Sequence, residues 1–349
     1  MTNKVESMYT YFARTAKPTG LRALGGSARQ VAADAHLARG TAPRDAAWLL
    51  HGAAAESMLL HVIAALAYKP VIMMHGVGSD AGEMNLIGKI LAEDHPGTVA
   101  TSLKVFENDA SWMNPLQKQV PGIIDAVREI VASNSSLFGG GYHFVCKSQG
   151  ALLCRFVLEE MNDHNVSTFI SLAGPQVGVY GPGFFKGAPW PLPGLAVDEI
   201  WRVVYEPPLG ESMQNHVSDA NMWRDPKHLD EFVTSNPVLP LYNGHASDAA
   251  IARYKANFVR LKSAVFCVGS GNEFDGGISP WQTGVWGSMD AAGRMVNMTE
   301  QRFYVNDTFG LRTLNESGRL LFTIIPGASH GDWTGDADLI RRAVVPRLD

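Results

Sequence analysis

Cysteine, positive charge and long apolar runs are all scarce in this chain of 349 residues. The three cysteines, Cys146, Cys154 and Cys267, lie in apolar strand or helix patterns, so we expect buried thiols and neither a disulfide framework nor a metal site. The chain has 29 basic against 34 acidic side chains, which leaves no basic surface for nucleic acid. Its apolar runs are shorter than the roughly 18 residues of a membrane-spanning helix, so we expect no stable span.

The first 67 residues differ in composition from the rest. Residues 1–57 are rich in alanine and arginine with little apolar periodicity, which favours a disordered or targeting extension. Residues 58–67 have the length of a signal-peptide hydrophobic region and end in an A-x-A cleavage pattern, which predicts a mature chain that begins near Tyr68. Because this segment starts late for a signal peptide, either initiation occurs downstream of Met1 or the segment is an apolar helix packed on the domain.

Strand-like and helix-like segments alternate over residues 68–349. Runs of strand type are expected at residues 71–74, 98–106, 142–145, 167–174, 264–271 and 320–327. Helices with apolar stripes are expected between most of them and at the end of the chain. Such alternation predicts an α/β domain with a mostly parallel central sheet and helices on both faces.

Ser148 lies where the sequence changes abruptly from strand to helix period. A serine at such a switch fits the nucleophile elbow of α/β hydrolases, in which a strained turn lifts the hydroxyl above the sheet edge. The usual pattern is G-x-S-x-G, and here Cys146 and Gly150 occupy the glycine positions. Cysteine is small enough for the turn. The alternative is that Ser148 only caps the helix that follows.

Chain order narrows the search for residues that would act with this serine. In α/β hydrolases an acid and then a histidine follow the nucleophile, on loops after later strands. His330 directly follows the final strand and is the expected base. Glu273 and Asp275 follow the strand before it, and Asp275 is preferred because the two glycines after it allow a tight turn.

The oxyanion of an acyl-transfer intermediate needs backbone donors. The expected donors are the N–H groups of Gln149, directly after the serine, and of Val77, in the loop after the first strand. We expect His75 to order that loop and not to act as the base.

The regular alternation stops in residues 176–245, which hold nine of the nineteen prolines. One helix is expected where Val197, Ile200, Trp201 and Val204 share a face. Because this insertion follows the strand after Ser148, it should lie over the catalytic edge of the sheet. Large apolar residues in it predict a small helical subdomain that leaves an apolar groove to Ser148, among them Phe184, Phe185, Trp190, Leu192 and Leu195.

Several segments, in order over residues 70–348, resemble palmitoyl-protein thioesterases. PVIMMHGVGSD is similar to the first strand and oxyanion loop of that family, and KSQG to its elbow, usually written GFSQGG. LAGPQVGVYGP, MWRDP and DTFGLRTLNESGRL resemble three further family segments. Trp281 follows Asp275 by six residues, which is the family's spacing between its triad acid and a tryptophan.

The resemblance implies an α/β-hydrolase fold and a serine hydrolase without metal or organic cofactor. Its substrates would be S-acylated proteins or peptides and fatty acyl thioesters, cleaved through an acyl-enzyme. It implies five roles: Ser148 as nucleophile, Asp275 as acid, His330 as base, and Val77 with Gln149 as oxyanion donors.

Two departures from the family keep rival functions open. Cys146 and Ala151 replace elbow glycines, and the disulfide cysteines common in animal members are absent. A lipase or carboxylesterase on the same fold is one alternative. A catalytically inactive homologue that binds lipids or lipidated proteins is the other.

Five Asn-x-Ser/Thr sequons favour the secretory pathway, with a lysosomal or secreted product. They begin at Asn134, Asn165, Asn297, Asn306 and Asn315.

Overall fold

The computed structural model describes residues 68–181, 196–270 and 278–349, and in these ranges six strands form one parallel sheet. Their order across the sheet is β2-β1-β3-β4-β5-β8. The strands are β1 Val71–Met74, β2 Ala100–Ser102, β3 Tyr142–Lys147, β4 Val166–Leu172, β5 Ser263–Ser270 and β8 Leu320–Pro326. Every pairing is parallel, which confirms the predicted sheet.

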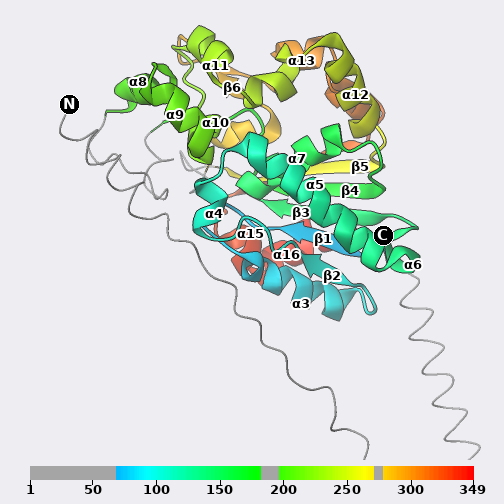
Figure 1. The fold of residues 1–349 in the computed structure, drawn as a ribbon. Coiled ribbons are helices and arrows are strands. Elements are labelled where there is room, and N and C mark those ends of the chain that lie inside the picture. Colours follow the sequence, from blue (N-terminus) through cyan, green and yellow to red (C-terminus); the bar gives the residue numbers. More distant parts are fainter. Residues whose placement is uncertain (1–67, 182–195, 271–277) are drawn as a thin grey trace, which may run out of the picture. The chain divides into compact units, whose positions relative to one another are not determined.

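Helices cover both faces of the sheet, as predicted. Figure 1 shows α5 and α7 over one face, and α3, α15 and α16 on the opposite side. The helices of the two layers are α3 Asn85–Asp94, α5 Leu116–Ser133, α7 Gln149–Glu160, α12 Asp248–Phe258, α15 Asp332–Gly335 and α16 Ala337–Ala343. Shorter helical turns are η1 Ala81–Met84, α4 Asp109–Trp112, α6 Ser135–Phe138 and η7 Val345–Arg347.

Burial follows from this layering. The central strands β3 and β4 are buried along their whole length, because helices pack on both of their faces. The edge strand β8 is only partly buried. Aromatic side chains of neighbouring strands contact one another in the core, for example Phe169 and Phe266, whose ring centroids lie 5.8 Å apart.

Residues 196–245, the larger described part of the insertion, are mostly helical. It comprises η3 Val197–Glu199, α8 Ile200–Tyr205, α9 Leu209–His216, α10 Ser218–Met222, α11 Leu229–Ser235 and η4 Leu241–His245. The helix expected over residues 197–204 is present as η3 and α8. The apolar residues at positions 184–195 lie outside the described residues.

A segment between β5 and β8 was not foreseen as structured. It contains a two-stranded antiparallel ladder and several short helices. These are η5 Trp281–Val285, β6 Ser288–Met289, β7 Met295–Val296, η6 Met298–Glu300, α13 Arg302–Val305 and α14 Leu311–Glu316. In the described ranges, no helix has the length and apolar character needed to cross a membrane.

Candidate active site

Ser148 occupies a strained turn between β3 and α7. Its backbone has φ 54° and ψ −129°, a conformation that residues with a side chain rarely adopt. Its N–H donates to the Leu172 carbonyl at 2.8 Å, which ties the turn to β4. The side chain makes no capping hydrogen bond to α7, so the alternative of a helix-capping serine is wrong. The predicted elbow is confirmed in its geometry.

Three glycines permit the close packing around the elbow. A Cβ on Gly150 would lie 2.2 Å from the His75 carbonyl oxygen, so only glycine fits behind the nucleophile. A Cβ on Gly76 would lie 3.0 Å from Ser148 Cβ, which places the loop after β1 directly against the serine. Gly174 leaves room for the methyl group of Ala151, because a Cβ there would lie 2.6 Å from it. The packing therefore accommodates Ala151, which stands where the family motif has glycine.

The loop after β1 is held by side chains on both sides. The ring nitrogens of His75 lie 2.8 Å from the Gly76 carbonyl and 3.1 Å from the Val105 carbonyl, so His75 orders this loop as predicted. The Gly78 N–H donates to Ser111 Oγ at 2.7 Å. Within the described chain, the N–H groups of Val77 and Gln149 have no backbone acceptor. Both are thus available to bind an oxyanion.

A buried polar network that the sequence did not reveal joins the insertion to the elbow. The Gln149 side chain donates to the Ser111 carbonyl at 2.8 Å and accepts from Ser218 Oγ at 2.6 Å. Gln119 of α5 donates to the same Ser111 carbonyl at 2.7 Å. Since Ser218 begins α10, this network places α10 beside the residue that follows the nucleophile. Isolated Ser and Gln residues carry no sequence signal for such a role.

The prediction that all three cysteines are free thiols is wrong. Cys146 and Cys154 form a disulfide, and only Cys267 is a free, buried thiol. The bond joins Cys146, near the end of β3, to Cys154 in the second turn of α7, and their Cα atoms are 6.6 Å apart. The strand and helix that the sequence placed on either side of the serine bring the two side chains together. The cysteine at the first glycine position of the elbow motif therefore clamps the turn.

His330 lies in the loop after β8, at the same edge of the parallel sheet as Ser148. The end of β5 and the loop after β8 are in close contact, because a Cβ on Gly269 would lie 2.0 Å from the Ala328 carbonyl oxygen. Both candidate acids, Glu273 and Asp275, fall outside the described residues. The choice between them stays a prediction.

One buried carboxyl near the elbow is unusual. Asp219 follows Ser218 in α10 and is 1% exposed, and neither carboxyl oxygen has a hydrogen-bond partner in the described structure. Burial raises the pKa of this carboxyl from 3.8 to about 7, and no charged neighbour contributes to the shift. Below about pH 7 the folded chain therefore favours the protonated form of Asp219.

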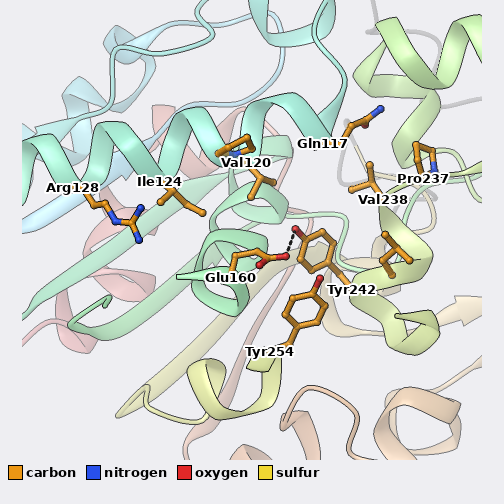
Figure 2. A pocket seen from close by; sticks show the side chains of 11 residues that line it. Gln117, Val120, Ile124, Arg128, Glu160, Pro237, Val238, Tyr242 and Tyr254 are labelled. Atoms are coloured by element: carbon orange, nitrogen blue, oxygen red, sulfur yellow. Dashed lines mark hydrogen bonds between the residues drawn. The ribbon is translucent and has the colours of Figure 1, made fainter. Parts of the chain in front are cut away.

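A cavity of about 350 Å³ lies between α5, the end of α7, η4 and α12. Figure 2 shows Tyr242 and Tyr254 beside Glu160, which accepts a hydrogen bond from Tyr242 Oη. A second cavity of about 430 Å³ lies among α11, η4 and α13. Neither is lined by Ser148 or His330. The predicted acyl groove thus corresponds to neither cavity.

Metal ligands do not gather at this edge. Over the described ranges, no three His, Cys, Asp or Glu side chains are grouped as ligands for an ion.

The parallel sheet, its strand order and a strained serine between a buried strand and a helix define an α/β hydrolase. Residues 70–330 match the family model described as palmitoyl protein thioesterase. The chain belongs to this family of thioester hydrolases, as the resemblance predicted.

Relatives of known name agree with the family. The chain is 35% identical over 282 residues to lysosomal thioesterase PPT2 of Homo sapiens, which covers 81% of this chain and 88% of that protein. It is 31% identical to the lysosomal thioesterase PPT2 homolog of Drosophila melanogaster, over 81% of this chain and 93% of that one. Among solved structures, a 2-hydroxy-6-oxo-6-phenylhexa-2,4-dienoate hydrolase from Rhodococcus is 13% identical with a TM-score of 0.42, covering 80% of this chain and 90% of that one. That likeness is too distant to add to the topology.

The disulfide should stabilise the fold measurably. Replacing Cys146 and Cys154 by alanine removes a cross-link that closes a short loop, so the free energy of unfolding should fall by roughly 2–3 kcal/mol. Thermal denaturation with and without reductant measures this: reductant should lower the melting temperature of the wild type but not that of the double variant. Alkylation of the unfolded, unreduced protein followed by intact mass should add one label, on Cys267. Three labels would contradict the disulfide.

Asp219 should make stability depend on pH. Its folded-state pKa of about 7 exceeds the unfolded value near 3.9, so the unfolded state loses its proton first and stability falls as pH rises from about 4 to 7. The free energy of unfolding should change by at most about 1.4 kcal/mol per pH unit through this group. The variant Asp219→Asn should lose this slope in urea denaturation at pH 5, 6 and 7, while Asp230→Asn, on an exposed carboxyl, should keep it. Parallel pH profiles for wild type and Asp219→Asn would contradict the assignment.

Proposed function

We propose that this chain is a serine thioesterase that removes long-chain fatty acyl groups from cysteine residues of lipidated proteins. Ser148 is the nucleophile, His330 the base and Asp275 the acid that orients it. The observation that carries the proposal is the strained backbone of Ser148, whose side chain does not cap the helix behind it and which lies against the loop of Val77.

The reaction needs two acyl transfers. His330 takes the Ser148 proton as the oxygen attacks the thioester carbonyl, and the N–H groups of Val77 and Gln149 bind the oxyanion. The carbon–sulfur bond then breaks, and the protonated His330 gives its proton to the departing sulfur, so that the thiol leaves and His330 is again a neutral base. Water, deprotonated by His330, hydrolyses the acyl-serine, and His330 returns its proton to Ser148. A thiolate is a better leaving group than an alkoxide, so leaving-group protonation matters less than in an oxyester hydrolase.

The elbow geometry favours an enzyme over an inactive homologue. Both departures from the glycine pattern are compensated, since Cys146 is cross-linked to α7 and Ala151 packs on Gly174. The same geometry serves a lipase or carboxylesterase, which therefore stays the alternative. The names of the relatives, all thioesterases, favour the thioester substrate.

A lysosomal location is proposed from the same names and from the disulfide, which persists in oxidising compartments. Residues 68–349 would form the catalytic domain, with residues 1–67 removed as a targeting segment and residues 176–245 as the insertion. Secretion and glycosylation are further proposals. Four sequon asparagines are exposed, Asn134, Asn165, Asn297 and Asn306. The fifth, Asn315, is only partly exposed and donates its amide to Tyr304 Oη at 2.7 Å.

Substitution of the triad residues should lower the turnover rate by orders of magnitude. Ser148→Ala and His330→Ala should each lower turnover of a palmitoyl thioester by roughly 10⁴-fold or more, because base and nucleophile act as a unit. A fluorophosphonate probe should label Ser148 in the wild type. Asp275→Asn should be less severe than either, and Glu273→Gln serves as its matched control. Full activity in Asp275→Asn with loss in Glu273→Gln would move the acid to Glu273.

Efficiency should depend on acyl-chain length. Each methylene buried in an apolar groove contributes about 0.8 kcal/mol, so kcat/KM should rise steeply from butyryl to palmitoyl thioesters measured below their micelle-forming concentrations. Matched oxyesters should be poorer substrates at each length. A flat or falling profile would favour a short-chain esterase.

A further inference from the structure

Glu83 links the two halves of the proposed site. Its side chain, from η1, accepts the Gly76 N–H on Oε2 at 2.8 Å. Its other oxygen, Oε1, accepts from the ammonium group of Lys147. Gly76 precedes the proposed oxyanion donor Val77, and Lys147 precedes Ser148. The Glu83 carboxylate therefore contacts the residue before Val77 and the residue before Ser148, and both Val77 and Ser148 must act on the same substrate carbonyl.

The carboxylate is close enough to affect the reaction. The position of a Cβ on Gly76 is 3.5 Å from Glu83 Oε2 and 3.6 Å from Ser148 Oγ, so these two oxygens are at most about 7 Å apart. The ion pair is shielded, with side-chain exposures of 9% for Lys147 and 15% for Glu83. A negative charge at this distance and in this environment opposes the negative charge that develops on the thioester oxygen.

Lys147 supplies the compensating charge. It directly precedes the nucleophile in the elbow. An ionisable side chain there needs a partner in a buried site, and Glu83 is the partner that the structure provides. The two residues are thus matched to each other in this chain.

We propose that Glu83 and Lys147 act together as positioning residues for the thioesterase reaction. The Glu83 carboxylate fixes the Gly76 N–H and so directs the Val77 N–H toward the oxyanion. The Lys147 ammonium cancels the charge of that carboxylate beside Ser148. This rests on the proposed function of Ser148 and Val77, and it assigns roles to two residues outside the triad.

A purely structural ion pair would give a different result. Its loss would lower stability and leave the turnover of the folded protein unchanged. In a positioning pair, the effect falls on kcat and depends on which charge is left behind. Substitutions that remove the charge of Glu83 but keep its hydrogen bond to Gly76 distinguish a structural pair from a positioning pair.

Four variants make this separation. Lys147→Met leaves the carboxylate uncompensated, so kcat should fall roughly 10- to 100-fold with little change in KM. Glu83→Gln keeps an acceptor for Gly76 and removes the negative charge, so its loss should be smaller, about 5-fold or less. Glu83→Met removes the acceptor as well and should lose more than Glu83→Gln. In Lys147→Met/Glu83→Gln both charges are absent and the acceptor is kept, so kcat should recover most of the loss.

The rates should be measured by steady-state hydrolysis and by the speed of fluorophosphonate labelling of Ser148, with thermal denaturation to show that each variant is folded. Lys89→Met, in an exposed ion pair on α3, is the matched control and should keep wild-type kcat. A kcat for Lys147→Met within about twofold of wild type would overturn the proposal, as would a double variant no better than Lys147→Met. The parallel variant Ser148→Ala separates the two hypotheses: if it is inactive while Lys147→Met is normal, only the pair's role fails. If Ser148→Ala keeps full turnover, the proposed function fails too.

Discussion

The strained backbone at Ser148 is the constraint on which the rest of the site depends. A residue with a side chain stays at φ 54° only when its surroundings exclude the alternatives. Here the turn is held from three directions: by the bond of its own N–H to Leu172, by the packing of Gly150 on the His75 carbonyl, and by the Cys146–Cys154 disulfide across it. One end of the disulfide, Cys146, stands at the first glycine position of the G-x-S-x-G pattern. The cross-link therefore helps to fix the direction of the turn at a position that also needs a small residue.

The same close packing explains why polar groups hold the loop beside the nucleophile. The loop after β1 approaches Ser148 so tightly that its N–H groups need acceptors nearby or must stay open for substrate. Gly76 and Gly78 find acceptors in Glu83 and Ser111, while the N–H of Val77 between them has no backbone acceptor among the residues that the structure describes. The loop is thus anchored on both sides of a single open donor, which is the pattern that an oxyanion site requires.

Sequence reading located the sheet, the elbow and the family because each has a continuous signal. Buried parallel strands read as apolar runs, and the switch of period at Ser148 lies within a few residues. The features it missed depend on contacts between distant or differently shaped segments. Cys146 and Cys154 each look like core residues of separate elements, and only the angle of the turn brings their Cα atoms to 6.6 Å. Nothing in the sequence around Glu83 indicates that its side chain contacts Gly76 and Lys147, and α10 is too short and too polar to show a period.

The disulfide and Asp219 favour particular conditions in the surrounding solution: the disulfide favours an oxidising one and Asp219 an acidic one. A disulfide between β3 and α7 forms and persists where thiols are oxidised, so it favours folding in an oxidising compartment over a reducing cytosol. A buried carboxyl without a partner is least unfavourable when it is protonated, and so it destabilises the fold less in acid than at neutral pH. An oxidising route to an acidic compartment would satisfy both demands.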